Sequence, residues 1–271
     1  MGYLQGEKPI TISKLLSMHR AGEKISVLTA YDSTMSALLN RCNLDVILVG
    51  DSLGNVVQGQ TSTTSVTLEQ MAYHTSCVAR SNNRTFLIAD LPFASYGHPE
   101  QALESAATLM RSGADMVKLE GGDWQIEIIR YLVNRSVPVC AHLGLMPQSV
   151  HVLGGYKIQG KSEDSAKLML EQAKACENAG AQMLVLEAIP SALGKTITNA
   201  LTIPTIGIGA GPDCSGQVLV LPDLLGISPG KPPKFVKNFM DGQSSIEEAI
   251  KAYISDVKSN RFPGPEHGFN S

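Results

Sequence analysis

The sequence predicts a single α/β domain folded as a closed (β/α)8 TIM barrel. The chain has 271 residues, a length that suits one such barrel of roughly 250 residues. Eight short apolar runs recur along it, alternating with segments of helical periodicity, as in parallel sheets built from βα units. No linker, low-complexity tract or long charge run divides the chain, so we expect one domain over residues 1–271.

Each apolar run is almost unbroken and ends in Gly, Asp, Glu, His or Pro. Strands buried on both faces have this continuous apolarity, and the polar residues mark the loops that follow. The runs are KISVLTAY from Lys24, VILVGD from Val46, TFLIADLP from Thr85, DMVKLEGG from Asp115, PVCAHLGL from Pro138, QMLVLEAI from Gln182, PTIGIGAG from Pro204 and QVLVLPDLLG from Gln217. Eight is the strand number of this barrel.

Helices are expected between the runs, where apolar residues recur at i, i+3 and i+4. Residues 99–113 begin with a proline and end with a glycine. Residues 162–180 begin with an N-cap serine and an acidic first turn, and they also end at a glycine. Residues 67–81 and 124–136 behave similarly.

Two further helices are expected outside the repeating units. An amphipathic helix over residues 11–22, within an N-terminal segment of residues 1–23, is expected to cap the bottom of the barrel. A closing helix over residues 245–258 begins a C-terminal segment of helix and tail, residues 245–271.

An open doubly wound sheet is the competing fold. It would be favoured by a GxGxxG turn after the first strand, and TAYDSTMS contains none. The stretch over residues 144–161 is too long for an ordinary βα loop, and loops of this length are usually lids or binding loops.

Composition excludes several classes of protein. With 22 Lys and Arg against 25 Asp and Glu, the net charge of −3 gives no basic field for nucleic acid. No apolar run is long enough to span a membrane, and the first residues contain no continuous apolar stretch typical of a signal peptide. The five cysteines contain no CxxC pair, so we expect them to be buried as small apolar residues in a cytoplasmic protein.

The apolar runs end in polar side chains that a barrel would gather at one rim, because the carboxyl ends of its strands meet there. Only 17% of the residues are charged, and buried strands disfavour them, so chance would scatter such groups. Five runs together contribute Asp51, Ser52, Asp90, Lys118, Glu120, His142 and Glu187. We expect the functional site at this rim.

Three of these residues form a candidate metal site. Asp51, Asp90 and Glu120 offer hard oxygen ligands from three neighbouring strands, and Mg²⁺ prefers such ligands. A metal there would chelate a 2-oxo acid and stabilise its enolate as a Lewis acid. The alternative is structural, with the aspartates as helix N-caps or loop ion pairs and Glu120 paired with a neighbouring lysine.

The other rim residues suggest proton transfer. Lys118 lies within an apolar run, so either a substrate oxygen or a nearby glutamate must offset its desolvation. Schiff-base chemistry is the less favoured role, since nearby carboxylates keep the ammonium protonated. Glu187 follows Leu-Val-Leu and suits a general base, or else a salt-bridged strand end. His142 is either functional or simply hydrogen-bonded in place.

The glycine-rich stretch GIGAG, residues 207–211, follows the seventh run. Many barrels bind phosphate at this position, but such a stretch also permits close approach of backbone or ligand.

At these residues the sequence closely resembles the ketopantoate hydroxymethyltransferase (3-methyl-2-oxobutanoate hydroxymethyltransferase) family. The resemblance extends from about residue 11 to residue 269, and many long motifs occur in the same order. They are TAYD, LVGDSLG, AYHT, ADLPF, MVKLEGG, VPVCAHLGLMPQS, GGYKIQGK, GAQMLVLEAIP, IPTIGIGAG, GQVLV and PKFVKNF.

The resemblance implies roles for the rim residues. It places the metal ligands at Asp51, Asp90 and Glu120, and the proton acceptor at Glu187. It places the 2-oxo acid contacts at Asp51, Ser52, Asp90 and Lys118, with His142 close to the substrate. It also implies a homodecamer of two pentameric rings.

The implied reaction, part of pantothenate biosynthesis, transfers a hydroxymethyl group from 5,10-methylenetetrahydrofolate to 3-methyl-2-oxobutanoate with Mg²⁺ as cofactor. Two departures from the family pattern are visible. Met146 stands where Thr is common, and Ser215 where Asp is common. We expect them to alter only loop details or folate contacts.

Two other functions remain as alternatives. A Mg²⁺-dependent 2-oxo acid carbon–carbon lyase or phosphoenolpyruvate mutase relative would use the same enolate chemistry without folate. Such lyases commonly carry a reactive cysteine in a flexible loop, and residues 144–161 contain none. A non-catalytic barrel is disfavoured, because it would have no reason to keep costly charges at its strand ends.

Overall fold

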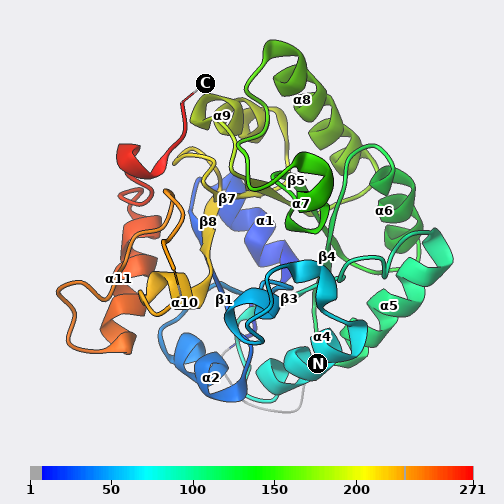
Figure 1. The fold of residues 1–271 in the computed structure, drawn as a ribbon. Coiled ribbons are helices and arrows are strands. Elements are labelled where there is room, and N and C mark those ends of the chain that lie inside the picture. The colour runs from blue at the N-terminus through cyan, green and yellow to red at the C-terminus, as the bar shows by residue number, and fades with distance from the viewer. Residues whose placement is uncertain (1–7, 229, 271) are drawn as a thin grey trace.

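Eight parallel strands close into a barrel in sequence order, with β8 beside β1, which confirms the predicted fold (Figure 1). The computed structural model describes residues 8–228 and 230–270. The strands are β1 (Ile25–Thr29), β2 (Val46–Val49), β3 (Phe86–Asp90), β4 (Met116–Glu120), β5 (Val139–Gly144), β6 (Met183–Glu187), β7 (Thr205–Ile208) and β8 (Gly216–Leu219).

The eighth apolar run is a strand only in its first part, so the predicted extent was wrong. β8 ends at Leu219, and a short helix, α10 (Leu221–Leu224), follows with Pro222 in its first turn. Proline has no N–H for a strand ladder but is tolerated where a helix begins. The N–H of Leu221 instead donates to Thr29 Oγ1 at 3.0 Å, which fixes this turn against β1.

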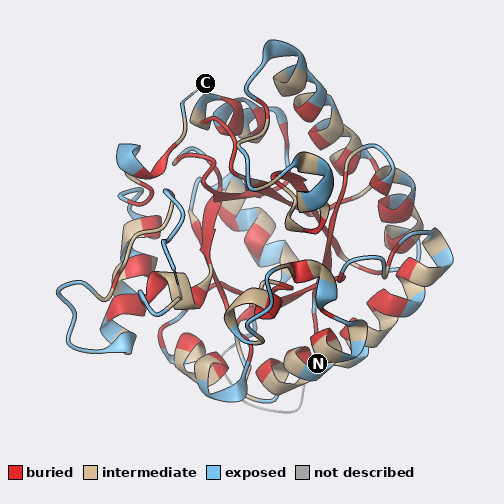
Figure 2. Ribbon diagram, viewed as in Figure 1, coloured by how far each residue is buried: buried red, intermediate tan, exposed pale blue. Residues whose placement is uncertain are grey.

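A ring of helices surrounds the barrel and buries one face of each helix against it (Figure 2). All six predicted helices are present, and each begins within two residues of its expected start. The larger helices are α2 (Ser33–Arg41), α4 (Leu68–Ala79), α5 (Pro99–Arg111), α6 (Gln125–Val133), α8 (Glu163–Asn178), α9 (Ser191–Ala200) and α11 (Ile246–Lys258). No helix in the described part of the chain combines the length and apolarity needed to cross a membrane.

The helix ends follow the chemistry expected from the sequence. The Ser162 hydroxyl accepts from the N–H of Ser165 at 3.3 Å, which caps α8. Thr67 caps α4 in the same way, accepting from Gln70 N at 3.3 Å. Asp32 accepts from Met35 N at 2.9 Å and begins α2, a helix that periodicity alone did not single out.

The first helix, α1 (Ile12–Arg20), closes the amino end of the barrel, as predicted. Its Leu15 and Met18 are buried and belong to one apolar cluster with inward-pointing strand residues such as Ile25, Phe86 and Met116. Residues 1–7 of the predicted N-terminal cap lie outside the described residues. The open end of the barrel is therefore the carboxyl end.

The cysteines carry free thiols. Four are buried, as expected, and Cys77 is half-buried on α4. Cys140 lies inside the barrel, where burial raises the pKa of its thiol to about 12. These environments suit inert apolar packing rather than thiolate chemistry.

The C-terminal segment is held by an ion-pair cluster that gives a testable stability prediction. Asp256 on α11 lies 2.9 Å from both Lys237 Nζ and Arg261 Nε. Burial works to raise the pKa of Asp256, but the two cations outweigh it and lower the pKa overall. The stability from these contacts is therefore present above the ordinary aspartate pKa and is lost as the pH falls through the lowered one.

Replacing Asp256 with asparagine should lower the free energy of unfolding by about 1 kcal/mol near neutral pH, because both cations are partly exposed and screened. Urea unfolding at pH 7 and pH 3 would measure this, and the difference between wild type and variant should shrink at the lower pH. A difference that stays constant with pH would assign the effect to packing.

Candidate active site

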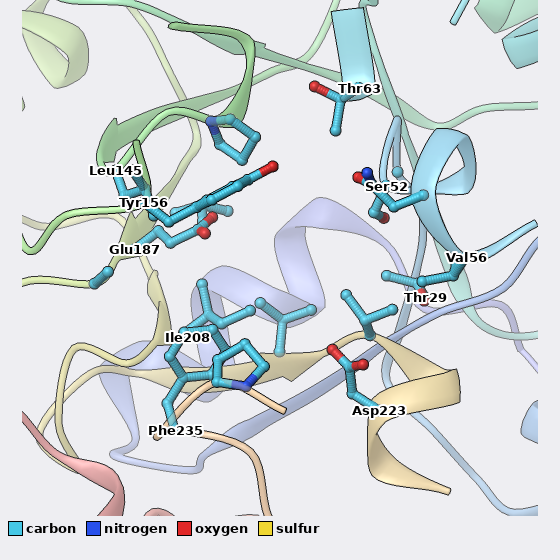
Figure 3. A pocket seen from close by; sticks show the side chains of 18 of the residues that line it. Thr29, Ser52, Val56, Thr63, Leu145, Tyr156, Glu187, Ile208, Asp223 and Phe235 are labelled. Atoms are coloured by element: carbon cyan, nitrogen blue, oxygen red, sulfur yellow. The ribbon is translucent and has the colours of Figure 1, made fainter. Parts of the chain in front are cut away.

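A cavity of about 730 Å³ opens at the carboxyl end of the barrel (Figure 3). All seven side chains predicted from the strand ends line it. In Figure 3, Tyr156 and Glu187 lie on one wall, opposite Ser52 and Val56, while Asp223 points inward from α10. The rim prediction is therefore correct about which residues meet.

Strand register explains why these residues meet. Asp90 of β3 pairs with Lys118 of β4. Glu120 pairs with His142 of β5, and Gly144 at the end of β5 pairs with Glu187 of β6. The members of each pair are direct neighbours on adjacent strands, so the polar side chains at the carboxyl ends of these strands lie close together.

Lys118 is the positive centre of the deepest part of the cavity. Its Nζ lies 3.0 Å from Asp90 Oδ1 and 3.8 Å from Glu120 Oε1, and all three side chains are buried. Burial lowers the pKa of Lys118, but the neighbouring carboxylates outweigh it and raise the pKa above its ordinary value. The lysine is therefore a fixed cation, as expected, and a poor nucleophile.

Asp51 and Asp90 lie together because the N–H of Asp51 donates to Asp90 Oδ2 at 3.1 Å. Burial first, and then the charges of Asp90 and Glu120, raise the pKa of Asp51 well above its ordinary value. The local environment is thus short of positive charge. Asp90 Oδ1 accepts no well-aligned hydrogen bond, although Lys118 Nζ is 3.0 Å away.

These carboxylates fit a hard divalent cation in their chemistry. They supply buried oxygen donors, an excess of negative charge and one acceptor that is not fully used. Among residues 8–228 and 230–270, no group of three or more His, Cys, Asp or Glu side chains is arranged to hold a metal ion. Glu120 in particular faces His142 and accepts from the N–H of Gln148 at 3.1 Å.

His142 lies between two carboxylates. Its Nδ1 is 3.2 Å from Glu120 Oε1, and its Nε2 is 3.4 Å from Glu187 Oε2. Burial and then Lys118 lower the pKa of His142, but the two glutamates outweigh them and raise it to about 9. The imidazole therefore carries a positive charge at neutral pH and links Glu187, at the cavity wall, to the buried cluster.

Ser52 lies beside the aspartates and shares a hydrogen bond with Tyr31. The two hydroxyl oxygens are 2.9 Å apart, and the short helix α3 (Leu53–Val56) begins directly after Ser52. A Cβ on Gly50 would lie 2.8 Å from Ser52 Oγ, so glycine there leaves room for this hydroxyl. Ser52 thus offers a neutral hydrogen-bonding group next to the charged cluster.

Sequence reasoning missed two loop residues: Gln148, which donates to two of the carboxylates, and Tyr96, which hydrogen-bonds Gln148 and the backbone of Glu120. Gln148 is buried in the 3-10 turn η2 (Pro147–Ser149), and its Nε2 donates to Asp51 Oδ2 at 2.8 Å. Tyr96 donates to the Gln148 amide oxygen. Only the length of the loop at residues 144–161 pointed to this region, since neither side chain is charged.

The outer wall of the cavity comes from two loops. After η2, the long loop contains the short helix α7 (Val150–Leu153) and then Tyr156, which is 61% exposed yet lines the cavity. The segment after α10 contributes Lys231 and Phe235. The long loop, predicted to be a lid or a binding loop, thus lies at the cavity.

Two other features have structural explanations. Gly209 has a φ of 65°, and a Cβ on it would lie 2.7 Å from Phe235, so close packing explains the glycine at this position without phosphate.

Ser215 lies at the amino end of the barrel, where its Oγ is 2.8 Å from His19 Nδ1. Of the two effects expected for this departure, the position of Ser215 favours a change in loop structure over a change in folate contacts. Met146 directly precedes η2.

Comparison with solved structures supports the fold. The chain superposes on a phosphoenolpyruvate phosphomutase from Streptomyces platensis subsp. rosaceus with a TM-score of 0.61, at 14% identity, covering 80% of this chain and 83% of that one. It also superposes on 2,3-dimethylmalate lyase, a phosphoenolpyruvate mutase/isocitrate lyase superfamily member, with a TM-score of 0.59, at 17% identity, covering 93% and 98%. At this identity the likeness concerns the barrel alone.

Sequence comparison is far more specific. The chain is 59% identical to 3-methyl-2-oxobutanoate hydroxymethyltransferase 1 of Burkholderia ambifaria, over 99% of this chain and 100% of the relative. It is also 59% identical to the 3-methyl-2-oxobutanoate hydroxymethyltransferase of Cupriavidus necator, over the full length of both. The family model described as ketopantoate hydroxymethyltransferase matches residues 9–265. The chain belongs to the ketopantoate hydroxymethyltransferase family.

Proposed function

We propose that this chain transfers a hydroxymethyl group from 5,10-methylenetetrahydrofolate to 3-methyl-2-oxobutanoate and forms 2-dehydropantoate. The observation that carries the proposal is the buried cluster of carboxylates, lysine and histidine at the open end of the barrel, with Glu187 at its edge. Family membership at 59% identity over the whole chain supplies the substrates.

Asp51, Asp90 and Glu120 would hold Mg²⁺, as the family resemblance implies and their oxygen donors suit. When bound, the ion would polarise the 2-oxo acid as a Lewis acid and make its C3 proton more acidic. Lys118 would face the oxygen on which negative charge develops, because its ammonium is already fixed by Asp90. The Ser52 hydroxyl would form a hydrogen bond with the 2-oxo acid substrate.

Glu187 would take the C3 proton. It is the least buried of the cluster's carboxylates, with 15% of its side chain exposed, so it reaches the part of the cavity where substrate carbon would lie. His142 would hold the glutamate in place from the inner side and supply the positive charge that balances it. The inner half of the site would then hold the metal and the developing oxyanion, and the outer edge would supply the base.

The outer half of the cavity would receive the folate. A volume of about 730 Å³ is within the range of pockets for drug-sized ligands, and a five-carbon acid fills only a fraction of it. Water would add to the iminium carbon of the ring-opened folate, and cleavage of the C–N bond would leave tetrahydrofolate and formaldehyde. The enolate carbon would then attack formaldehyde, whose oxygen would take up the proton removed from C3 and become the new hydroxyl group. Tyr156 and Phe235 offer aromatic surfaces for the co-substrate.

Assembly and location complete the proposal. On the family resemblance, the chain would act as a cytoplasmic homodecamer of two pentameric rings, each protomer one barrel domain. Light scattering coupled to size-exclusion chromatography would measure the assembly, and a monomeric mass would contradict it.

The first test is proton NMR of 3-methyl-2-oxobutanoate in D₂O with purified protein and Mg²⁺, without folate. We expect loss of the C3–H signal, and we expect EDTA to abolish that loss. If exchange is absent, adding tetrahydrofolate to the same tube tests whether folate must bind first. Continued absence of exchange, together with no 2-dehydropantoate from the complete mixture, would overturn the proposed function.

A further inference from the structure

Gln148 makes an unusually complete set of hydrogen bonds for a loop residue. Both protons of its Nε2 are used, one toward Asp51 Oδ2 at 2.8 Å and one toward Leu91 O at 3.0 Å. Its backbone N–H donates to Glu120 Oε2 at 3.1 Å. The loop after β5 thus reaches the ends of β2, β3 and β4 through one residue.

The orientation of the amide is determined by its neighbours. Asp51 Oδ2 and Leu91 O are acceptors, so the nitrogen must face them. The amide oxygen then faces the Tyr96 hydroxyl, whose O–H donates to it. Tyr96 is itself buried and its ring stacks on Trp124 with centroids 5.6 Å apart, so the phenol is a rigid support.

We propose that Gln148 is a positioning residue: its side-chain amide orients Asp51 and its backbone N–H orients Glu120, two of the carboxylates taken as ligands of a divalent cation. It carries no charge, so it fixes the two carboxylates without neutralising them. Residues that orient metal ligands contribute to metal affinity, and their loss typically weakens binding by about 10- to 100-fold. The inference rests on the proposed function only in taking these carboxylates as metal ligands.

The bonds also connect cation binding to the long loop. Gln148 lies eight residues before Tyr156, whose ring forms the outer wall of the cavity. A loop that hydrogen-bonds the carboxylates at its base is anchored where the cation would sit. The conformation of the loop at its base and the orientation of the carboxylates therefore depend on the same hydrogen bonds.

The test uses Gln148→Met, which keeps the approximate side-chain volume and removes the amide bonds. Isothermal titration calorimetry with MgCl₂ alone should show binding about 10- to 100-fold weaker than in the wild type. The kcat should recover to within a few-fold of the wild-type value at saturating Mg²⁺. Tyr96→Phe, which removes the hydroxyl that orients the amide and contacts the backbone of Glu120, but leaves the bond from Gln148 to Asp51, should give a smaller loss of affinity in the same direction.

Gln182→Met is the matched control, because Gln182 Oε1 accepts from Val139 N at 3.0 Å at the opposite end of β5. It loses a side-chain amide bond at the amino end of the barrel, away from the carboxylates, and should keep wild-type Mg²⁺ affinity. If Gln148→Met binds Mg²⁺ within twofold of wild type, or if the wild type binds none, the positioning role is wrong. Absence of C3 exchange in the wild type would count against the proposed function instead, since the titration does not depend on turnover.

Discussion

Glu187→Gln is expected to slow exchange of the C3 proton of 3-methyl-2-oxobutanoate by about 10²- to 10⁴-fold, the usual contribution of a general base. Glutamine keeps the size of the side chain and leaves an oxygen or nitrogen facing His142, whose Nε2 lies 3.4 Å from the Glu187 carboxylate. It cannot take a proton. The measurement is the rate of C3–H loss in D₂O with Mg²⁺.

Two comparisons make this result specific. Mg²⁺ affinity should change little, because Glu187 is not among the three carboxylates assigned to the metal. Glu171→Gln, on the exposed face of α8, makes the same chemical change away from the cavity and should exchange at the wild-type rate. Equal exchange rates in Glu187→Gln and wild type would remove Glu187 from the role of base.

Lys118→Met should have the largest effect on stability. Lys118 neutralises a buried group of carboxylates, with contacts of 3.0 Å to Asp90 and 3.8 Å to Glu120. Removing one partner of a buried ion pair typically costs about 3–5 kcal/mol, because the remaining charge stays buried without compensation. We also expect turnover to fall below a hundredth of the wild-type rate, since the developing oxyanion loses its nearest fixed cation.

Urea unfolding in metal-free buffer measures the stability loss. The loss should be smaller at pH 5 than at pH 8, because protonation of the uncompensated carboxyls removes the charge that needs a partner. Lys195→Met is the control: that ammonium lies on the surface 3.7 Å from Asp213, and its loss should cost no more than about 0.5 kcal/mol. A Lys118→Met protein as stable as this control would show that water reaches the cluster.

The sequence was sufficient for the rim residues because strand ends carry positional information. A parallel strand buried on both faces produces an unbroken apolar run, and the residue after it must lie at the carboxyl edge. Asp90, Glu120 and Glu187, which end β3, β4 and β6, were predictable for this reason. The predicted end of the eighth strand failed because Leu-Pro-Asp-Leu-Leu is as apolar as a strand, while Pro222 begins a helix.

The environment of each group was less predictable, because it depends on contacts between distant segments. His142 was left between two roles, since its sequence neighbours do not reveal that Glu120 and Glu187 flank it. Gln148 gave no signal at all. An uncharged residue in a long loop becomes informative only when folding brings it against Asp51, 97 positions away.

The closure of the amino end by α1 has a kinetic consequence. Because Leu15 and Met18 fill that end of the barrel in the described part of the chain, the acid and the folate of the proposed reaction would both enter from the carboxyl end. A small acid seated on the inner cluster would lie beneath a larger folate in the outer half. We therefore expect an ordered mechanism, in which the acid binds first and tetrahydrofolate leaves before the new hydroxy acid. Excess folate bound ahead of the acid would block its entry and slow turnover.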